Sequence, residues 1–78
     1  MIYPVQLRMA RAALGWSVKE LASKVKVHAN TIARFEAGHE VLSGTLDRVS
    51  QVFDDQGLSL IEQNGDFGVI VRAIKKRR

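Results

Sequence analysis

SVKELASKVKVHANTIARFEAG, residues 17–38, contains two short helical patterns separated by a tight turn. Ser17 and Glu20 have the S-x-x-E spacing of a capping box, in which each side chain bonds a free backbone N–H at the start of a helix. The apolar positions of this first helix follow at helical spacing and are Leu21, Ala22 and Val25. The pattern breaks at Lys26-Val27, which predicts the turn.

The second helix of the pair is predicted from His28 to Glu36. Helical spacing turns Ile32 and Phe35 inward, and Gly38 is typical of the residue that stops a helix. Two helices joined in this way predict a helix-turn-helix, whose second helix can enter the major groove of DNA.

One helix is predicted on each side of this pair. Pro4 suits the first turn of a helix that Gly15 ends. Downstream, Ser43 or Thr45 is expected to cap a fourth helix that ends by Gly57, with an apolar stripe of Leu46, Val49, Val52 and Phe53.

After the helices, Asn64-Gly65 lies between residues 58–63 and 66–71 and strongly indicates a two-residue β-hairpin turn. Strand alternation puts Ile61 and Ile70 on one face, and on the other Leu58, Leu60, Phe67, Val69 and Val71. A lone hairpin is marginal in water and leaves its edges open. We therefore predict a homodimer through the hairpin, by strand pairing across a two-fold axis, with the contact residues Ile61, Phe67, Val69 and Ile70. The alternative is a monomer whose hairpin caps the core.

The fold class that follows is mostly α, with four helices and a C-terminal β-hairpin. We expect a helix-turn-helix DNA-binding domain over residues 1–57 and a hairpin of the same domain over residues 58–72. A basic tail follows over residues 73–78, which either contacts DNA phosphates without reading sequence or only aids solubility.

The net charge of +4 is divided unevenly along the chain. Residues 1–34 hold six basic side chains and one acidic, residues 35–71 hold one basic and seven acidic, and residues 72–78 hold five basic. The separation favours one defined surface for a polyanion over a uniformly basic protein.

Several functional classes lack support in the sequence. The 78 residues contain no cysteine, no apolar run long enough to span a membrane and no signal-peptide pattern, so we expect a cytoplasmic protein without a membrane partner. The two histidines, His28 and His39, have no metal-ligand spacing, and no nucleophile motif or phosphate-binding glycine loop is present. We therefore expect no enzyme activity, no metal and no cofactor.

Residues 6–53 resemble the phage repressor and Cro-like (Xre-type) helix-turn-helix family. The marks of the resemblance, at matching spacings, are Arg11, Leu21-Ala22, Val27, Thr31-Ile32, Glu36 and Gly38. It implies a four-helix, lambda-repressor-like domain. It also implies a largely buried ion pair between Arg11 and Glu36 that joins the first helix to the third. Two residues depart from the family pattern, since Lys26 stands where the turn usually holds glycine and Val18 where helix 2 often holds glutamine.

The resemblance also implies which residues contact DNA. The family reads bases mainly from positions that here hold Ala29, Asn30 and Arg34. Arg34 can fork onto guanine, Asn30 onto adenine, and Ala29 can meet a thymine methyl group. Phosphate contacts are expected from the start of helix 2, the turn and neighbouring positions, namely Arg8, Ser17, Lys19, Lys26, His28 and Thr31.

The function implied is a sequence-specific transcriptional regulator that binds double-stranded DNA as a homodimer on an inverted repeat. We expect a repressor or autoregulator of the kind carried by phages and other mobile genetic elements. Activation through contact with RNA polymerase stays open. The alternatives are an antitoxin or other protein-interaction module that also binds DNA, and a non-specific architectural protein.

Overall fold

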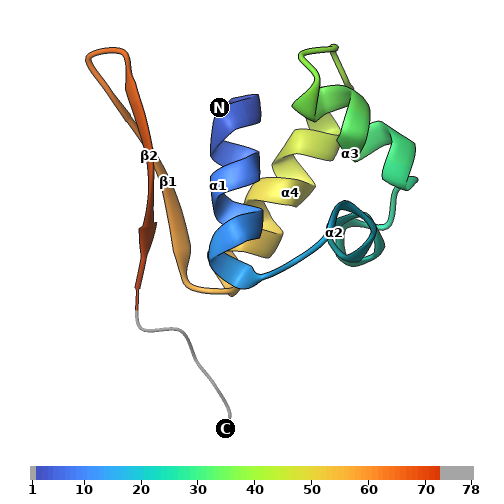
Figure 1. The fold of residues 1–78 in the computed structure, drawn as a ribbon, viewed down its shortest axis with the longest axis horizontal. Coiled ribbons are helices and arrows are strands. Elements are labelled where there is room, and N and C mark those ends of the chain that lie inside the picture. The colour runs from blue at the N-terminus through green and yellow to red at the C-terminus, as the bar shows by residue number, and fades with distance from the viewer. Residues whose placement is uncertain (1, 73–78) are drawn as a thin grey trace, which may run out of the picture.

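The computed structural model describes residues 2–72; the predicted basic tail, residues 73–78, lies outside the described residues. Four helices are followed by two antiparallel strands, and the hairpin lies along one side of the helical body, beside the first helix (Figure 1). The mostly α fold class predicted from the sequence is therefore confirmed. The elements are α1 (Pro4–Leu14), α2 (Val18–Val25), α3 (Ala29–Glu36), α4 (Ser43–Asp55), β1 (Leu58–Gln63) and β2 (Asp66–Val71).

The ends of the helices follow from local sequence with one exception. Pro4 opens α1, and Gly15 closes it in the left-handed region at φ 71°. The predicted cap of α4 was wrong, because Leu42 is the capping residue and no side chain bonds the free N–H groups there. Ser43 is already helical and Thr45 is buried, so its side chain faces the core instead of the helix end.

The core lies between the four helices and the inner face of the hairpin. Its largest fully buried apolar side chains are Leu7, Leu21, Val25, Ile32, Val49, Phe53 and Leu58. They come from α1, α2, α3, α4 and the first residue of β1. Each helix therefore contributes the inward stripe that its spacing predicts, and the helix-turn-helix pair is held from behind by α1 and α4.

The hairpin has the predicted turn and register. Asn64 and Gly65 both have positive φ, at 54° and 84°, as a tight hairpin turn of this length requires. Gln63 pairs with Asp66, Leu60 with Val69 and Leu58 with Val71. The face that carries Leu58, Leu60 and Val69 packs on the helices, and the opposite face leaves Ile61 41% and Ile70 47% exposed.

Gln6 ties α1 to the hairpin, and sequence analysis did not identify it. Its side chain is 1% exposed. Its Oε1 accepts from the Tyr3 backbone N–H at 3.0 Å, and its Nε2 donates to the carbonyl oxygens of Ile61 at 2.6 Å and Gly68 at 3.2 Å. The Tyr3 ring also packs on Phe67, with centroids 4.2 Å apart. Both the oxygen and the nitrogen of the Gln6 amide therefore have hydrogen-bond partners, and these bonds hold the hairpin against α1.

We expect Gln6→Glu to lower the free energy of unfolding by about 2–3 kcal/mol, because a carboxylate would face two carbonyl oxygens without a proton to donate. Urea denaturation followed by circular dichroism measures the change. Gln51→Glu is the matched control on the exposed surface of α4, where the loss of the hydrogen bond to Asp55 should change stability by no more than about 0.5 kcal/mol. Equal effects of the two substitutions would contradict the role given to Gln6.

Candidate nucleic-acid interface

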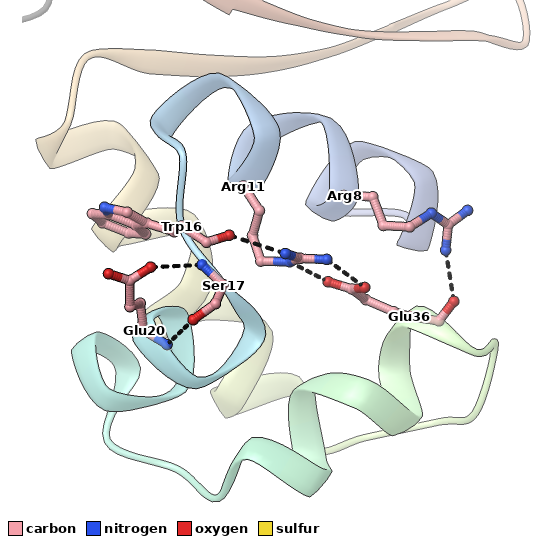
Figure 2. Close-up of polar contacts among 6 residues, drawn as sticks. All are labelled: Arg8, Arg11, Trp16, Ser17, Glu20 and Glu36. Carbon is pink, nitrogen blue, oxygen red and sulfur yellow. Dashed lines mark hydrogen bonds and ion pairs between the residues drawn. The ribbon is translucent and has the colours of Figure 1, made fainter.

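The helix-turn-helix begins with the predicted capping box. The Glu20 N–H donates to Ser17 Oγ at 3.0 Å, and the Ser17 N–H donates to Glu20 Oε1 at 2.7 Å (Figure 2). These bonds satisfy two backbone donors at the start of α2 and fix the direction in which the chain enters it. Other donors of the first turn of α2 have no partner within the helix, which makes this end suited to a phosphate.

The turn between α2 and α3 depends on an unusual lysine conformation. Lys26 has φ 67° and ψ 48°, the left-handed region, and its N–H donates to the Ala22 carbonyl at 2.8 Å. A side chain with a Cβ is strained in this conformation, whereas glycine is not. The Lys26 side chain is exposed, so the turn presents a positive charge at the cost of local strain.

This strain gives a testable expectation for Lys26→Gly, which should raise the free energy of unfolding by about 1 kcal/mol. Thermal or urea unfolding measures the gain. Lys26→Ala is the matched control, because it removes the charge and keeps the Cβ. Its free energy of unfolding should not rise. A gain for Lys26→Ala as large as that for Lys26→Gly would assign the effect to charge instead of backbone strain.

The outward face of α3 carries the predicted reading residues. Ile32 and Phe35 are buried, and Asn30 and Arg34, four residues apart on the opposite face, are exposed. Ala29 differs from them, because it is only half-exposed and packs against the core. The structure thus brings Asn30 and Arg34 together at the surface of α3, with Ala29 at its edge.

Arg11 and Glu36 form the ion pair that the resemblance implies, and it joins α1 to the last residue of α3 (Figure 2). Arg11 Nε donates to Glu36 Oε2 at 2.6 Å and Nη2 to Oε1 at 2.9 Å. The side chains are 19% and 12% exposed. A further bond runs from Arg11 Nη1 to the Trp16 carbonyl at 3.0 Å. The hydrogen bonds to Glu36 raise the pKa of Arg11 above its ordinary value, although burial acts in the opposite direction.

Arg8 takes a position that sequence analysis did not predict. Its Nη1 donates to the Glu36 backbone carbonyl at 2.7 Å, so the guanidinium bonds one of the free carbonyl groups at the C-terminal end of α3 (Figure 2). Both arginines of α1 therefore hold the C-terminal end of α3. A phosphate contact from Arg8 would need this bond to be shared or broken.

The other predicted phosphate-contact residues lie on or beside the helix-turn-helix. The exposed ones are Ser17, Lys19, Lys26 and His28, and Thr31 is half-exposed. His28 immediately precedes α3 as its N-cap, but its side chain makes no capping hydrogen bond. Its imidazole is thus left at the surface beside the free N–H groups of the helix start.

Arg48 is a candidate DNA contact that sequence analysis missed. A hollow of about 420 Å³ lies between α3 and the start of α4, and His28, Thr31, Arg34 and Arg48 are among its lining residues. The Nε of Arg48 donates to the Val25 carbonyl at the end of α2, at 3.3 Å. The signal in the sequence was its isolation, because Arg48 is the single basic residue within the acidic residues 35–71.

Residues 2–72 show neither a membrane-spanning helix nor a cluster of metal ligands. No helix in this part of the chain is long and apolar enough to cross a membrane. Over the same residues, no three His, Asp or Glu side chains gather in a way that would hold a metal ion.

Comparison with known families identifies the helical part of the chain. A family model described as "Helix-turn-helix" matches residues 7–54, which is more than half of the chain. The match extends from α1 through α4 and stops before the hairpin. No curated protein matches the chain.

Proposed function

Because the chain belongs to the Xre/Cro-like helix-turn-helix family of DNA-binding transcription regulators, we propose that it is a repressor or autoregulator that binds an inverted-repeat operator as a homodimer. The observation that supports sequence reading most directly is the exposed pair Asn30 and Arg34 on one face of α3. Their side chains match adenine and guanine edges in the major groove.

The contacts behind α3 support the same proposal. A reading helix discriminates between bases only when its side chains are held in a fixed position. Glu36 at the end of α3 bonds both arginines of α1, through its carboxylate to Arg11 and through its carbonyl to Arg8. Exposed basic groups beside α3, including Lys26 and Arg48, would then hold the phosphates on either side.

A dimer would present two copies of α3 to successive major grooves. Half-sites centred roughly 10 bp apart, about 34 Å along the duplex, are expected for such an arrangement.

The experiment that tests the proposal is selection of bound duplexes from a random DNA pool at about 150 mM salt, followed by sequencing. Enrichment of an inverted repeat with half-sites about one turn apart supports a dimeric, sequence-reading regulator. Enrichment of a single half-site would retain the reading helix and reject the dimer. No enrichment would reject sequence-specific binding.

A second candidate function is an antitoxin or related module that binds another protein as well as DNA. It is favoured by the exposed apolar side chains of Ile61 and Ile70 on the outer face of the hairpin. Expression together with the product of a neighbouring gene, followed by purification, tests it. A stable complex that is lost in Ile61→Lys and retained in Ser59→Lys, on the same hairpin face, would support this function.

A further inference from the structure

The hairpin leaves two strand edges, and their hydrogen-bonding groups can be identified. The Arg72 N–H donates to the Gly57 carbonyl at 2.8 Å, so these two residues form a hydrogen-bonded pair. Such pairs alternate with non-hydrogen-bonded pairs along an antiparallel ladder. With the observed register, the outward N–H and C=O groups on β1 belong to Leu58, Leu60 and Glu62, and those on β2 to Phe67, Val69 and Val71.

The edge of β1 has acidic surroundings. α4 lies against β1, and a hollow of about 420 Å³ between them is lined in part by Asp47, Asp54, Ser50 and Gln51. A second copy paired with this edge across a two-fold axis would bring two sets of these carboxylates together. Like charges at close range oppose association, which disfavours the β1 edge.

The edge of β2 has apolar surroundings. α1 lies mainly against β2, with Gln6 bonded to the Gly68 carbonyl and Tyr3 packed on Phe67. At 100° per residue, the side of α1 beyond these contacts and away from Arg11 carries Val5, Met9, Ala12 and Ala13. Val5, Ala12 and Ala13 are exposed and none of the four is charged.

The two arginines of α1 lie away from the β2 edge. Both bond Glu36 at the end of α3, on the side of α1 opposite the hairpin, as the ribbon shows (Figure 1). Among the described residues, the surface formed by the β2 edge and the four apolar residues of α1 carries one charged side chain, that of Asp66 at the turn end of β2. We refer to it below as the β2–α1 surface.

We propose that a second copy of this chain pairs through the β2–α1 surface, so that two hairpins form one four-stranded antiparallel sheet backed by two α1 helices. This inference rests on the homodimer of the proposed function and specifies its contacts. α3 lies across the helical body from the hairpin (Figure 1), so the pairing leaves both reading helices free for DNA.

The register of the new strand pair follows from the outward groups. The alignment that uses all of them places Val69 opposite its own copy and Phe67 opposite Val71 of the second copy. An aromatic and a β-branched side chain then form a cross-strand pair. The arrangement explains why Phe67 and Val71, on the face toward the helices, remain 38% and 47% exposed within one chain.

Amide hydrogen exchange on the full chain, followed by NMR without DNA, tests directly whether the β2 edge forms the dimer contact. Above the dissociation constant of the dimer, the amides of Phe67, Val69 and Val71 should exchange at least tenfold more slowly than in dilute protein. The amides of Leu60 and Glu62 should not change. Protection of Leu60 and Glu62 instead, or of neither edge in a dimer seen by sedimentation, would overturn the inference.

A pair of variants tests the same surface through charge. Val5→Glu places an acid on the β2–α1 surface, and Gln51→Glu places one in the hollow beside β1; each lowers the net charge by one. An acid in the first turn of α1 suits the helix dipole, so Val5→Glu is expected to fold. Sedimentation should give a dimer dissociation constant raised at least tenfold by Val5→Glu and unchanged by Gln51→Glu. The reverse result would assign the interface to β1.

Binding to a duplex with a single half-site separates this inference from the proposed function. Val5→Glu should bind the half-site as tightly as the unaltered chain, because Val5 does not lie on α3; Gln51 lines a hollow together with Lys26 and Arg48, so this comparison uses Val5→Glu alone. A chain that is monomeric at every concentration yet enriches one DNA sequence would overturn the dimer and leave sequence reading intact. A dimer protected at β2 that enriches no DNA sequence would support the inferred dimer contacts and reject sequence-specific binding.

Discussion

Glu36→Ala is expected to lower the free energy of unfolding by about 3 kcal/mol, because it leaves the largely buried guanidinium of Arg11 without its ionic partner. For a chain of this size, a loss of that magnitude corresponds to a fall in melting temperature of roughly 12–24 °C. A carboxylate in the last turn of a helix is also disfavoured by the helix dipole. The position therefore tolerates Glu36 because Arg11 Nε and Nη2 each donate to it.

Thermal unfolding of three further variants makes this expectation specific. Glu40→Ala removes an exposed carboxylate four residues away and should change stability by less than about 0.5 kcal/mol. The double variant Arg11→Met with Glu36→Ala should be clearly more stable than Glu36→Ala, since no unpaired charge remains. Arg11→Met alone completes the cycle. A loss below 1 kcal/mol for Glu36→Ala would show that the pair does not hold α1 and α3 together.

The parts of the fold that sequence predicted well are those set by local chemistry. The capping box of Ser17 and Glu20, the glycine that ends α1 and the Asn64-Gly65 turn each depend on residues within a few positions of one another. The hairpin register followed from the turn alone, because a two-residue loop determines every pair along the strands.

The contacts that sequence did not predict join residues far apart in the chain. Gln6 bonds carbonyl groups 55 and 62 residues away, and nothing in its neighbourhood indicates those partners. Arg8 was expected at a phosphate, yet it bonds the Glu36 carbonyl, since α1 brings it to the end of α3. Thr45 was a possible cap by residue type, but its burial in the core decided its role.

The same distinction applies to the candidate interface. The exposure of Asn30 and Arg34 follows from helical spacing once Ile32 and Phe35 face inward. The position of Arg48 beside α3 depends instead on how α4 packs, and the packing of Ala29 against the core is a tertiary contact that helical spacing did not predict. In the hairpin, Phe67 and Val69 were predicted dimer residues, and the structure places both on the face toward the helices. A role for them in a dimer would come through the open edge of β2, while Ile61 and Ile70 form the outer face.

Arg34→Ala is expected to abolish the preference of the protein for guanine at one operator position. A bidentate contact from arginine to guanine is worth about 1–3 kcal/mol against the wrong base, which corresponds to roughly a 5- to 150-fold ratio of dissociation constants. The Arg34 side chain is exposed, and it donates no hydrogen bond within residues 2–72. Its removal should therefore leave the melting temperature unchanged. Titration of the selected operator and its single-base variants by fluorescence anisotropy measures the effect.

The contrast with Arg34→Lys and Lys26→Ala decides what Arg34 does. Lysine keeps the charge and loses the planar fork of donors, so Arg34→Lys should retain the salt dependence of binding and lose most of the base preference. Lys26→Ala should weaken binding to all sequences alike and reduce the salt slope by about one. If Arg34→Ala behaved as Lys26→Ala does, Arg34 would be a phosphate contact. Sequence reading by α3 would then depend on Asn30, and Asn30→Ala would be the variant that loses discrimination.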